Sequence, residues 1–184
     1  MSPFFTRSGD DGYSGLLGEG RLPKYDLRME ALGSLDEANA ALGLARVSLS
    51  SPEHAHLVLN VQRDLYRIMA EIAASPENAA RFHSLDAQDI TRLEEQIEAI
   101  EKEVQVPERF IVPGDTLPAA RLDLARTIVR RAERRVAELI HRGDIRNEFL
   151  IPYLNRLSSL CFILELYEIQ AGGRPAPTLA GEGG

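Results

Sequence analysis

Arginine is concentrated in one segment of the chain, between residues 117 and 142. Seven of the 21 basic residues lie there: Arg121, Arg126, Arg130, Arg131, Arg134, Arg135 and Arg142. On a helix, Arg126, Arg130, Glu133 and Arg134 would share one face. Guanidinium groups bind phosphate oxygens through paired hydrogen bonds, so this face suits a polyanionic ligand. A solvated face of charge pairs, such as Arg130 with Glu133, is the alternative interpretation.

A second candidate site lies near the N-terminus, where glycines alternate with hydroxyl and charged residues. Residues 6–15 read Thr-Arg-Ser-Gly-Asp-Asp-Gly-Tyr-Ser-Gly, and Arg21 and Lys24 follow. Glycines let backbone N–H groups converge on an anion, and the hydroxyl groups add donors. No Gly-Lys-Ser or Gly-Lys-Thr occurs, so this is not a Walker A loop. The segment is typical of either a phosphate-binding loop or a mobile N-terminal arm.

Asp36 is the third candidate, because on the helix predicted here it shares a face with small and apolar residues. Ala40, Gly43 and Val47 follow it at helical spacing, while leucines form a separate stripe. A helix that is apolar on two sides is packed between neighbours, and a buried carboxylate there requires a cationic partner. The alternative is a surface aspartate near a helix N-terminus, where the helix dipole favours it.

Long helices must position these residues. Hydrophobic periodicity, capping residues, prolines and glycines predict five helices: from a capping box at Ser34 to about residue 49, from Pro52 to before Pro76, from Asp86 to about residue 104, from Pro118 to about Arg142, and from Asn147 to Ala171. We expect Pro152 to kink the fifth helix. No alternating strand pattern competes, so the predicted fold is an all-α five-helix bundle.

Composition narrows the function. The chain has 184 residues, a net charge of −7 and one cysteine. The acidic balance argues against general binding to nucleic acid or anionic membranes, and the lone Cys161 leaves no disulfide framework within one chain. No apolar run is long enough to span a membrane and no targeting segment is recognisable, so we expect a cytoplasmic protein.

Four blocks of sequence, in this order, resemble the PduO-type ATP:cob(I)alamin adenosyltransferases. They are Thr6-Arg7-Ser8-Gly9-Asp10-Asp11-Gly12 through Lys24, Glu30 to Glu37, Phe110-Ile111-Val112-Pro113-Gly114, and Ala125 to Arg135 together with Tyr153 to Ser158. The resemblance covers residues 6 to about 170. The chain departs from the family pattern at Asp115, which stands where a second glycine is usual, and its tail has no aromatic residue.

The resemblance implies a homotrimer with an active site at each subunit interface, where the 5′-deoxyadenosyl group of ATP passes to the cobalt of cob(I)alamin. It implies that ATP is bound by Thr6, Arg7, Ser8, Gly9, Ser14, Gly15, Lys24, Arg130, Arg131, Glu133, Arg134 and Asn155. Glu133 would hold Mg²⁺ near the phosphates. Asp36 would pair with Arg126 across the subunit interface and order the cobalamin side, and Phe110 would lie beneath the corrin.

The same resemblance implies three parts in one domain: residues 1–33 as a nucleotide-binding loop segment, 34–171 as the helical bundle and 172–184 as a flexible tail. A reductase and an adenosylcobalamin-dependent enzyme are the partners it implies. Two other classes of protein stay open on the sequence alone. One is an ATP- and cobalamin-binding delivery or sensor protein with weak turnover, and the other is a helical scaffold whose arginine-rich helix binds an acidic partner.

Overall fold

Five long helices account for most of the fold. The structure, a computed structural model, describes residue 5 and residues 7–181. In chain order its elements are β1 (Tyr13–Gly15), β2 (Arg21–Pro23), α1 (Leu27–Arg46), α2 (Pro52–Ala73), a 3-10 helix η1 (Pro76–Phe82), α3 (Ala87–Glu101), α4 (Leu117–His141) and α5 (Leu150–Ala171). The predicted helical bundle is therefore confirmed in its helices.

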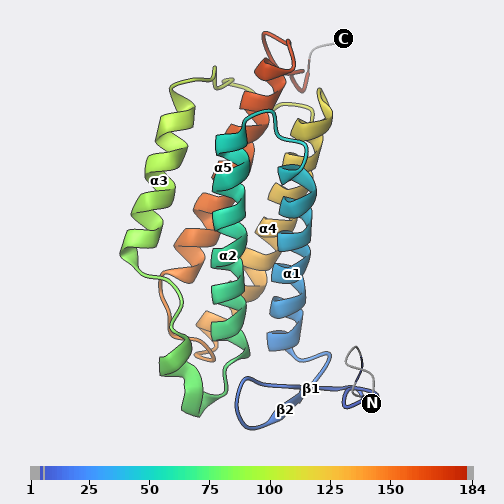
Figure 1. Ribbon diagram of the computed structural model, residues 1–184, viewed down its shortest axis with the longest axis vertical. Coiled ribbons are helices and arrows are strands. Elements are labelled where there is room, and N and C mark those ends of the chain that lie inside the picture. Colours follow the sequence, from blue (N-terminus) through green and yellow to red (C-terminus); the bar gives the residue numbers. More distant parts are fainter. Residues whose placement is uncertain (1–4, 6, 182–184) are drawn as a thin grey trace.

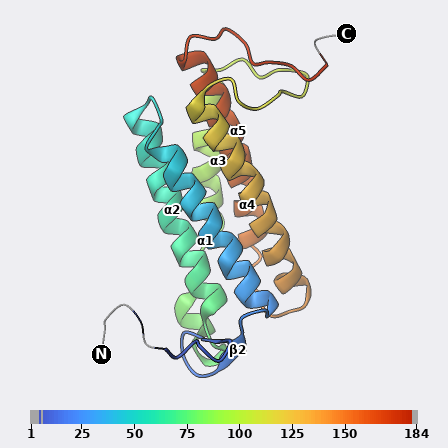
Figure 2. The same cartoon turned by 90° about the vertical axis from the view of Figure 1, so that its right-hand side faces the viewer.

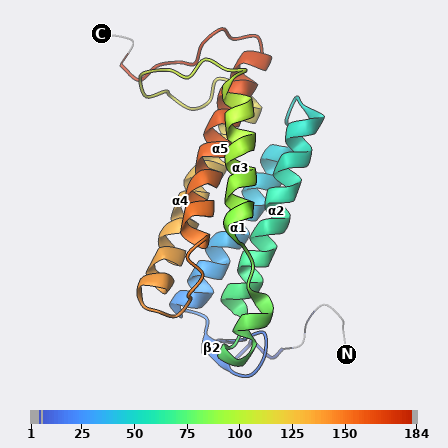
Figure 3. The ribbon, with the colours of Figure 1, turned by 90° about the vertical axis from the view of Figure 1, so that its left-hand side faces the viewer.

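The helices run alongside one another with their apolar faces turned inward (Figure 1). Figure 2 shows α1 and α4 side by side on one face, and Figure 3 shows α3 on the opposite face, where it packs on α5. Fully buried leucine and isoleucine side chains from α1, α2, α4 and α5 form the core. No helix in the described part of the chain is long and apolar enough to cross a bilayer.

Three of the predicted helix starts are confirmed by cap geometry. The Ser51 side chain caps α2 ahead of Pro52, Asp86 forms a reciprocal capping box with Asp89 on α3, and Thr116 caps α4. At the other end of α4, Gly143 has a φ of 79°, which suits a glycine that ends a helix.

The predicted start of the first helix at Ser34 is wrong. Helix α1 begins at Leu27, where the carboxylate of Asp26 accepts a hydrogen bond from the backbone of Arg28. Ser34 is only 7% exposed and lies in the second turn, so its Ser-x-x-Glu spacing is a coincidence of composition inside a helix. Asp36 consequently lies well inside α1 rather than near its N-terminus, and the helix dipole does not account for it.

Two further expectations need correction. Helix α5 begins at Leu150, so Pro152 falls in its first turn, where a missing N–H removes no helical hydrogen bond and gives no reason for a kink. The fold is also not purely helical, because β1 and β2 pair antiparallel with Ser14 opposite Leu22. Each strand has three residues, which is too short for an alternating pattern to be recognisable in the sequence.

Candidate active site

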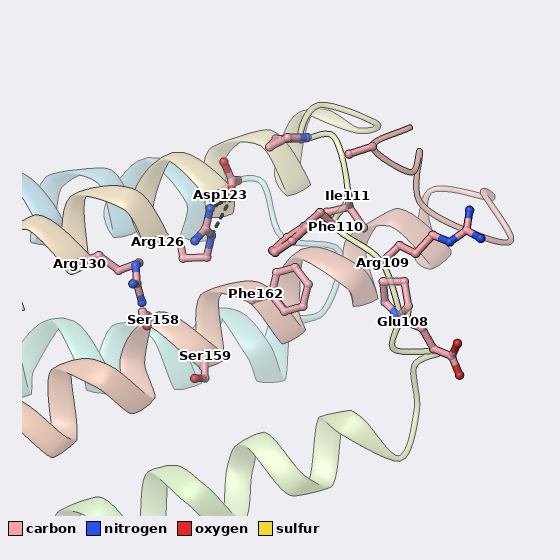
Figure 4. A pocket seen from close by; sticks show the side chains of 13 residues that line it. Glu108, Arg109, Phe110, Ile111, Asp123, Arg126, Arg130, Ser158, Ser159 and Phe162 are labelled. Atoms are coloured by element: carbon pink, nitrogen blue, oxygen red, sulfur yellow. Dashed lines mark hydrogen bonds and ion pairs between the residues drawn. The ribbon is translucent and has the colours of Figure 1, made fainter. Parts of the chain in front are cut away.

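A groove with a volume of about 760 Å³ opens between α4, α5 and the loop that joins α3 to α4 (Figure 4). It is lined by Pro107, Glu108, Arg109, Phe110, Ile111, Pro113, Asp123, Arg126, Arg130, Ser158, Ser159, Phe162 and Ala180. The predicted residues Phe110, Arg126 and Arg130 are thus brought to one surface from two distant segments. Its loop end combines apolar side chains with the charged Glu108 and Arg109, and its α4 side carries Asp123, Arg126 and Arg130.

Phe110 is the most exposed large apolar side chain of the described residues, at 89%. Figure 4 shows it beside Phe162 of α5, and together the two rings form an apolar wall. Holding an aromatic ring out in water is unfavourable unless something covers it, so this wall is suited to a large apolar ligand. Phe110 was predicted from the sequence, whereas Phe162 was not, because it falls within the apolar pattern of α5.

Arg126 is ion-paired within its own helix. Its Nε donates to Oδ1 of Asp123 over 2.8 Å, and its Nη2 lies 2.7 Å from the same oxygen. Asp36 lies on α1 and is exposed, so within one chain it does not pair with Arg126. Asp123 was not among the predicted site residues, although its i, i+3 spacing from Arg126 on one helix is the kind of signal that would have found it.

The remaining arginines of α4 divide into paired and unpaired groups. Arg131 forms an ion pair with Glu37 of α1, which gives it a role within the chain. By contrast, Arg130 and Arg134 are exposed, and within residues 5 and 7–181 neither guanidinium has a hydrogen bond or ion pair. These two arginines, one turn apart on α4, are therefore free to bind an anion.

Glu133 lies between these arginines in sequence and faces α5. Its Oε1 accepts a hydrogen bond from Nδ2 of Asn155 over 3.1 Å, so the predicted pair of Glu133 and Asn155 is brought together. The bond leaves the second carboxylate oxygen available. One carboxylate plus phosphate oxygens is a common way for proteins to hold Mg²⁺, so the residues present fit that ion.

The predicted phosphate loop forms a compact turn above the hairpin. The side chain of Lys24 lies over Gly9, where an added Cβ would come within 3.2 Å of its Nζ. The Lys24 backbone N–H donates to the carbonyl of Gly12 over 2.9 Å, and Arg21 holds the turn through a two-bond ion pair with Asp11. Hydrogen bonds from Arg21 hold the pKa of Asp11 below its usual value.

The other predicted members of this loop are placed by the same turn. Ser14 and Gly15 belong to β1, Arg7 has a positive φ of 62°, and Ser8 accepts from Arg21 through its carbonyl. Thr6 lies outside the described residues. Leu17 fastens the hairpin to the end of α2 through hydrogen bonds with Ala73 and Ser75. Small residues and local ion pairs therefore bring Gly9 and Lys24 together.

Two buried groups lie behind the groove on α5. Burial raises the pKa of the Cys161 thiol to about 12, which makes it a neutral core group. Glu165 is fully buried and neither of its oxygens has a hydrogen-bond partner in the described part of the chain. Burial, and then the charge of Asp123, raise the pKa of Glu165 to about 8.

Comparison with known proteins decides the family. The family model described as cobalamin adenosyltransferase matches residues 4–168. The chain belongs to this family. The match includes the glycine-rich N-terminal loop, the whole loop that joins α3 to α4, and α4 itself, so the resemblance predicted from four blocks of sequence is confirmed.

Relatives of this cobalamin adenosyltransferase family member come from several bacteria. The corrinoid adenosyltransferase of Bacillus subtilis is 38% identical over 162 residues, covering 86% of this chain and 82% of that protein. The corrinoid adenosyltransferase PduO of Citrobacter freundii is 38% identical over 161 residues, covering 87% of this chain. Those residues are 48% of that protein, so the chain spans about half the length of this relative.

Solved structures of the family have the same fold. A variant of the PduO-type ATP:corrinoid adenosyltransferase from Lactobacillus reuteri, complexed with cobalamin and ATP, superposes with a TM-score of 0.88. It is 30% identical in sequence, and the superposition covers 97% of this chain and 99% of that one.

Proposed function

We propose that this chain transfers the 5′-deoxyadenosyl group of ATP to the cobalt of cob(I)alamin and releases triphosphate. The observation that carries the proposal is the groove of Figure 4, where the rings of Phe110 and Phe162 lie in the same groove as Arg126 and the unpaired Arg130. A corrin ring needs apolar surface, and a triphosphate needs cations. The relatives that are named as corrinoid adenosyltransferases support the same assignment.

The chemical step needs no catalytic base. Cobalt in cob(I)alamin is a strong nucleophile, and its lone pair forms the new bond to the 5′ carbon while the C–O bond to triphosphate breaks. The electron pair of that bond leaves with the triphosphate, so no proton has to move. The protein must hold the two reactants in line and stabilise the charge on the leaving group.

We assign the stabilising role to the unpaired guanidiniums of Arg130 and Arg134, with the turn of Gly9 and Lys24 as a second phosphate-binding element. The ATP site in this proposal also includes Thr6, Arg7, Ser8, Ser14, Gly15, Arg131, Glu133 and Asn155. Glu133 and Asn155 would hold Mg²⁺ together with phosphate oxygens. When bound, that ion supplies further neutralisation of the triphosphate charge.

Phe110 is the residue we place beneath the corrin ring. An aromatic side chain there excludes water and the axial ligand from cobalt, which leaves cob(II)alamin four-coordinate and easier to reduce. Its exposure in a single chain fits a group that is covered only when corrin binds. Because this role concerns the reduction that precedes transfer, it is separable from ATP binding at α4.

We place the complete site between subunits of a homotrimer. The hairpin and the Phe110 loop lie at opposite ends of the bundle in one chain (Figure 1). Helix α1, with 20 residues, separates them by roughly 30 Å, which is longer than an extended ATP molecule. The exposed Asp36 lies on the same face of α1 as Leu44 and Val47, which are also exposed. A second copy that covers this face would bring Arg126 to Asp36, and a stable monomer by light scattering at micromolar concentration would contradict this.

The proposal retains the division into a nucleotide-binding segment (1–33), a bundle (34–171) and a tail (172–184), and a cytoplasmic location. It also includes a reductase that supplies the electron and an adenosylcobalamin-dependent enzyme that receives the product. The deciding experiment is anaerobic incubation with ATP, Mg²⁺ and chemically reduced cobalamin. We expect a light-sensitive cobalt–carbon bond in the absorption spectrum and stoichiometric triphosphate. Binding of both ligands without triphosphate release would instead indicate a delivery or sensor protein.

A further inference from the structure

The end of the chain pairs with the loop that carries Phe110. Ile111 and Leu179 form an isolated antiparallel bridge. On one side of it the Val112 N–H donates to the carbonyl of Thr178 over 2.7 Å, and on the other side the Ala180 N–H donates to the carbonyl of Phe110 over 2.8 Å. The backbone on both sides of Ile111 is therefore held by the tail, and Ala180 itself lines the groove beside Phe110.

One side chain fastens the tail in this position. The side chain of Asp115 is only 6% exposed and accepts three hydrogen bonds from the tail. Its Oδ1 accepts from Nη1 of Arg174 over 2.6 Å and from Oγ1 of Thr178 over 2.8 Å, and its Oδ2 accepts from the Thr178 backbone over 2.7 Å. The carboxylate of Asp115, just before α4, therefore holds Thr178, and the carbonyl of Thr178 in turn accepts the hydrogen bond from Val112.

The tail is also directed toward this loop where it leaves α5. An added Cβ on Gly172 would lie 2.7 Å from the Thr116 side chain, so only glycine fits this approach. The Thr116 hydroxyl donates to the carbonyl of Glu168 over 3.4 Å. Hydrogen bonds from the Thr178 backbone and hydroxyl, with the Arg174 charge, hold the pKa of Asp115 below its usual value, so the carboxylate is ionised throughout the neutral range.

We infer that residues 174–180 act as a strap that fixes the Phe110 loop, and that Asp115 is the positioning residue for Phe110. This rests on the proposed role of Phe110 beneath the corrin. Phe110 is 89% exposed, so side-chain packing does little to fix its ring. Its position therefore depends on how firmly its backbone is held. Without the strap the loop would sample other positions, and water or the axial ligand would stay on cobalt.

The test is Asp115→Asn, which keeps the shape of the side chain but removes its charge. The substitution also replaces one accepting oxygen with an NH₂ group, which would face the donors of Arg174 or Thr178. The measurement is electron paramagnetic resonance of cob(II)alamin bound with ATP. We expect the ratio of four-coordinate to five-coordinate cobalt to fall roughly tenfold, as loss of charge-assisted hydrogen bonds implies. ATP affinity should stay unchanged. Glu103→Gln is the matched control, since it removes a charge from the same loop but no side-chain hydrogen bond within the described residues.

A covalent tether separates positioning from a general loss of stability. Ile111 and Leu179 are a non-hydrogen-bonded antiparallel pair, whose Cα separation of about 4.5 Å is within the range for a disulfide. Ile111→Cys with Leu179→Cys should restore the four-coordinate signal of Asp115→Asn when oxidised and lose it again when reduced. The same pair in the wild-type background gives the reference level.

Hydrogen exchange at the Val112 amide supplies a readout that does not depend on cobalamin. We expect faster exchange in Asp115→Asn than in wild type and restored protection in the oxidised tether. Unchanged exchange and an unchanged cobalt ratio in Asp115→Asn would overturn the inference, as would an oxidised tether that restores exchange protection without the cobalt signal. If wild type gave no four-coordinate cobalt while Asp115→Asn still exchanged faster, the proposed role of Phe110 would be wrong, but the strap would stand.

Discussion

Two groups of arginines, on opposite sides of the bundle, differ in what neutralises them. Between α2 and α3, Arg67 and Arg92 share the carboxylates of Asp64 and Asp89, with Arg92 Nη2 at 2.7 Å from Asp89 Oδ1. On α4, Arg130 has no such partner in the part of the chain that the structure describes. The first group is neutralised by folding alone, whereas Arg130 on α4 is not, which is why we propose that it binds ATP.

The carboxylates show the same contrast. Asp64 and Asp89 are buried, and Asp64 also accepts from the Tyr153 hydroxyl over 2.8 Å. Burial alone would raise the pKa of Asp89, but hydrogen bonds from the Asp86 backbone and from Arg92 hold it below its usual value. Asp36 on α1, by comparison, is exposed. We therefore expect charges that are paired within the chain to serve stability, and the unpaired charges to serve the ligand and subunit contacts proposed above.

The sharpest test of this contrast is Arg130→Ala. Loss of a charge-assisted contact to phosphate should weaken ATP binding by roughly tenfold to a hundredfold, while the melting temperature stays within about 1 °C of wild type. Arg130→Lys should restore little, because an ammonium group cannot reproduce the paired hydrogen bonds. Calorimetric titration with ATP measures the first effect and thermal unfolding the second. An unchanged affinity would remove Arg130 from the site.

Glu165 is an exception to the contrast between buried, paired carboxylates and exposed, unpaired ones, because it is buried but has no hydrogen-bond partner within the described residues. Its pKa is raised by burial from 4.5 to about 8. The stability it contributes is therefore complete below about pH 4.5 and is lost as the pH rises toward 8. Glu165→Gln titrates no proton, so its stability relative to wild type should rise by at least about 2 kcal/mol as the pH increases from 5 to 8.

Denaturant unfolding at several pH values measures this difference, and Asp10→Asn, an exposed carboxylate, is the control. Asp123, Arg126 and Asp115 are the charged groups whose fields act on Glu165. If the stability gap between Glu165→Gln and wild type were constant from pH 5 to 8, Glu165 would have an ordinary pKa, and burial would not govern its charge.

Arg92→Ala is the counterpart of Arg130→Ala on the satisfied side of the bundle. Asp64 and Asp89 would lose one of their two cations but keep Arg67, so the free energy of unfolding should fall by about 1.5 kcal/mol. ATP affinity should be unchanged. A reversal of the two outcomes, with ATP binding lost here and stability lost in Arg130→Ala, would show that the division between the two groups is wrong.

The sequence predicted most of the helices, because periodicity and caps such as Asp86 are local signals. The start of α1 was mispredicted because Ser34 and Glu37 have the spacing of a capping box, although Ser34 is buried in the second turn and Asp26 caps the helix. Helical spacing placed Arg126 and Arg130 on one face of α4, and both line the groove. The pairing of Asp115 with Thr178 could not be predicted, because 63 residues separate them and the tail has no periodicity.

The smallest effect concerns Tyr153, which completes the satisfied network from α5. Its hydroxyl is buried and donates to Asp64, and burial raises the pKa of the phenol, so the proton stays on the tyrosine at every accessible pH. Tyr153→Phe removes one donor but leaves Asp64 bonded to Arg67 and Arg92. The free energy of unfolding should therefore fall by only about 1 kcal/mol, or roughly 2 to 4 °C in melting temperature. Adenosylation should be unaffected, since Tyr153 lines none of the groove in Figure 4. A loss of several kcal/mol would instead mean that Asp64 depends on this hydroxyl rather than on the arginines, and that the network is held from α5 and not from α2 and α3.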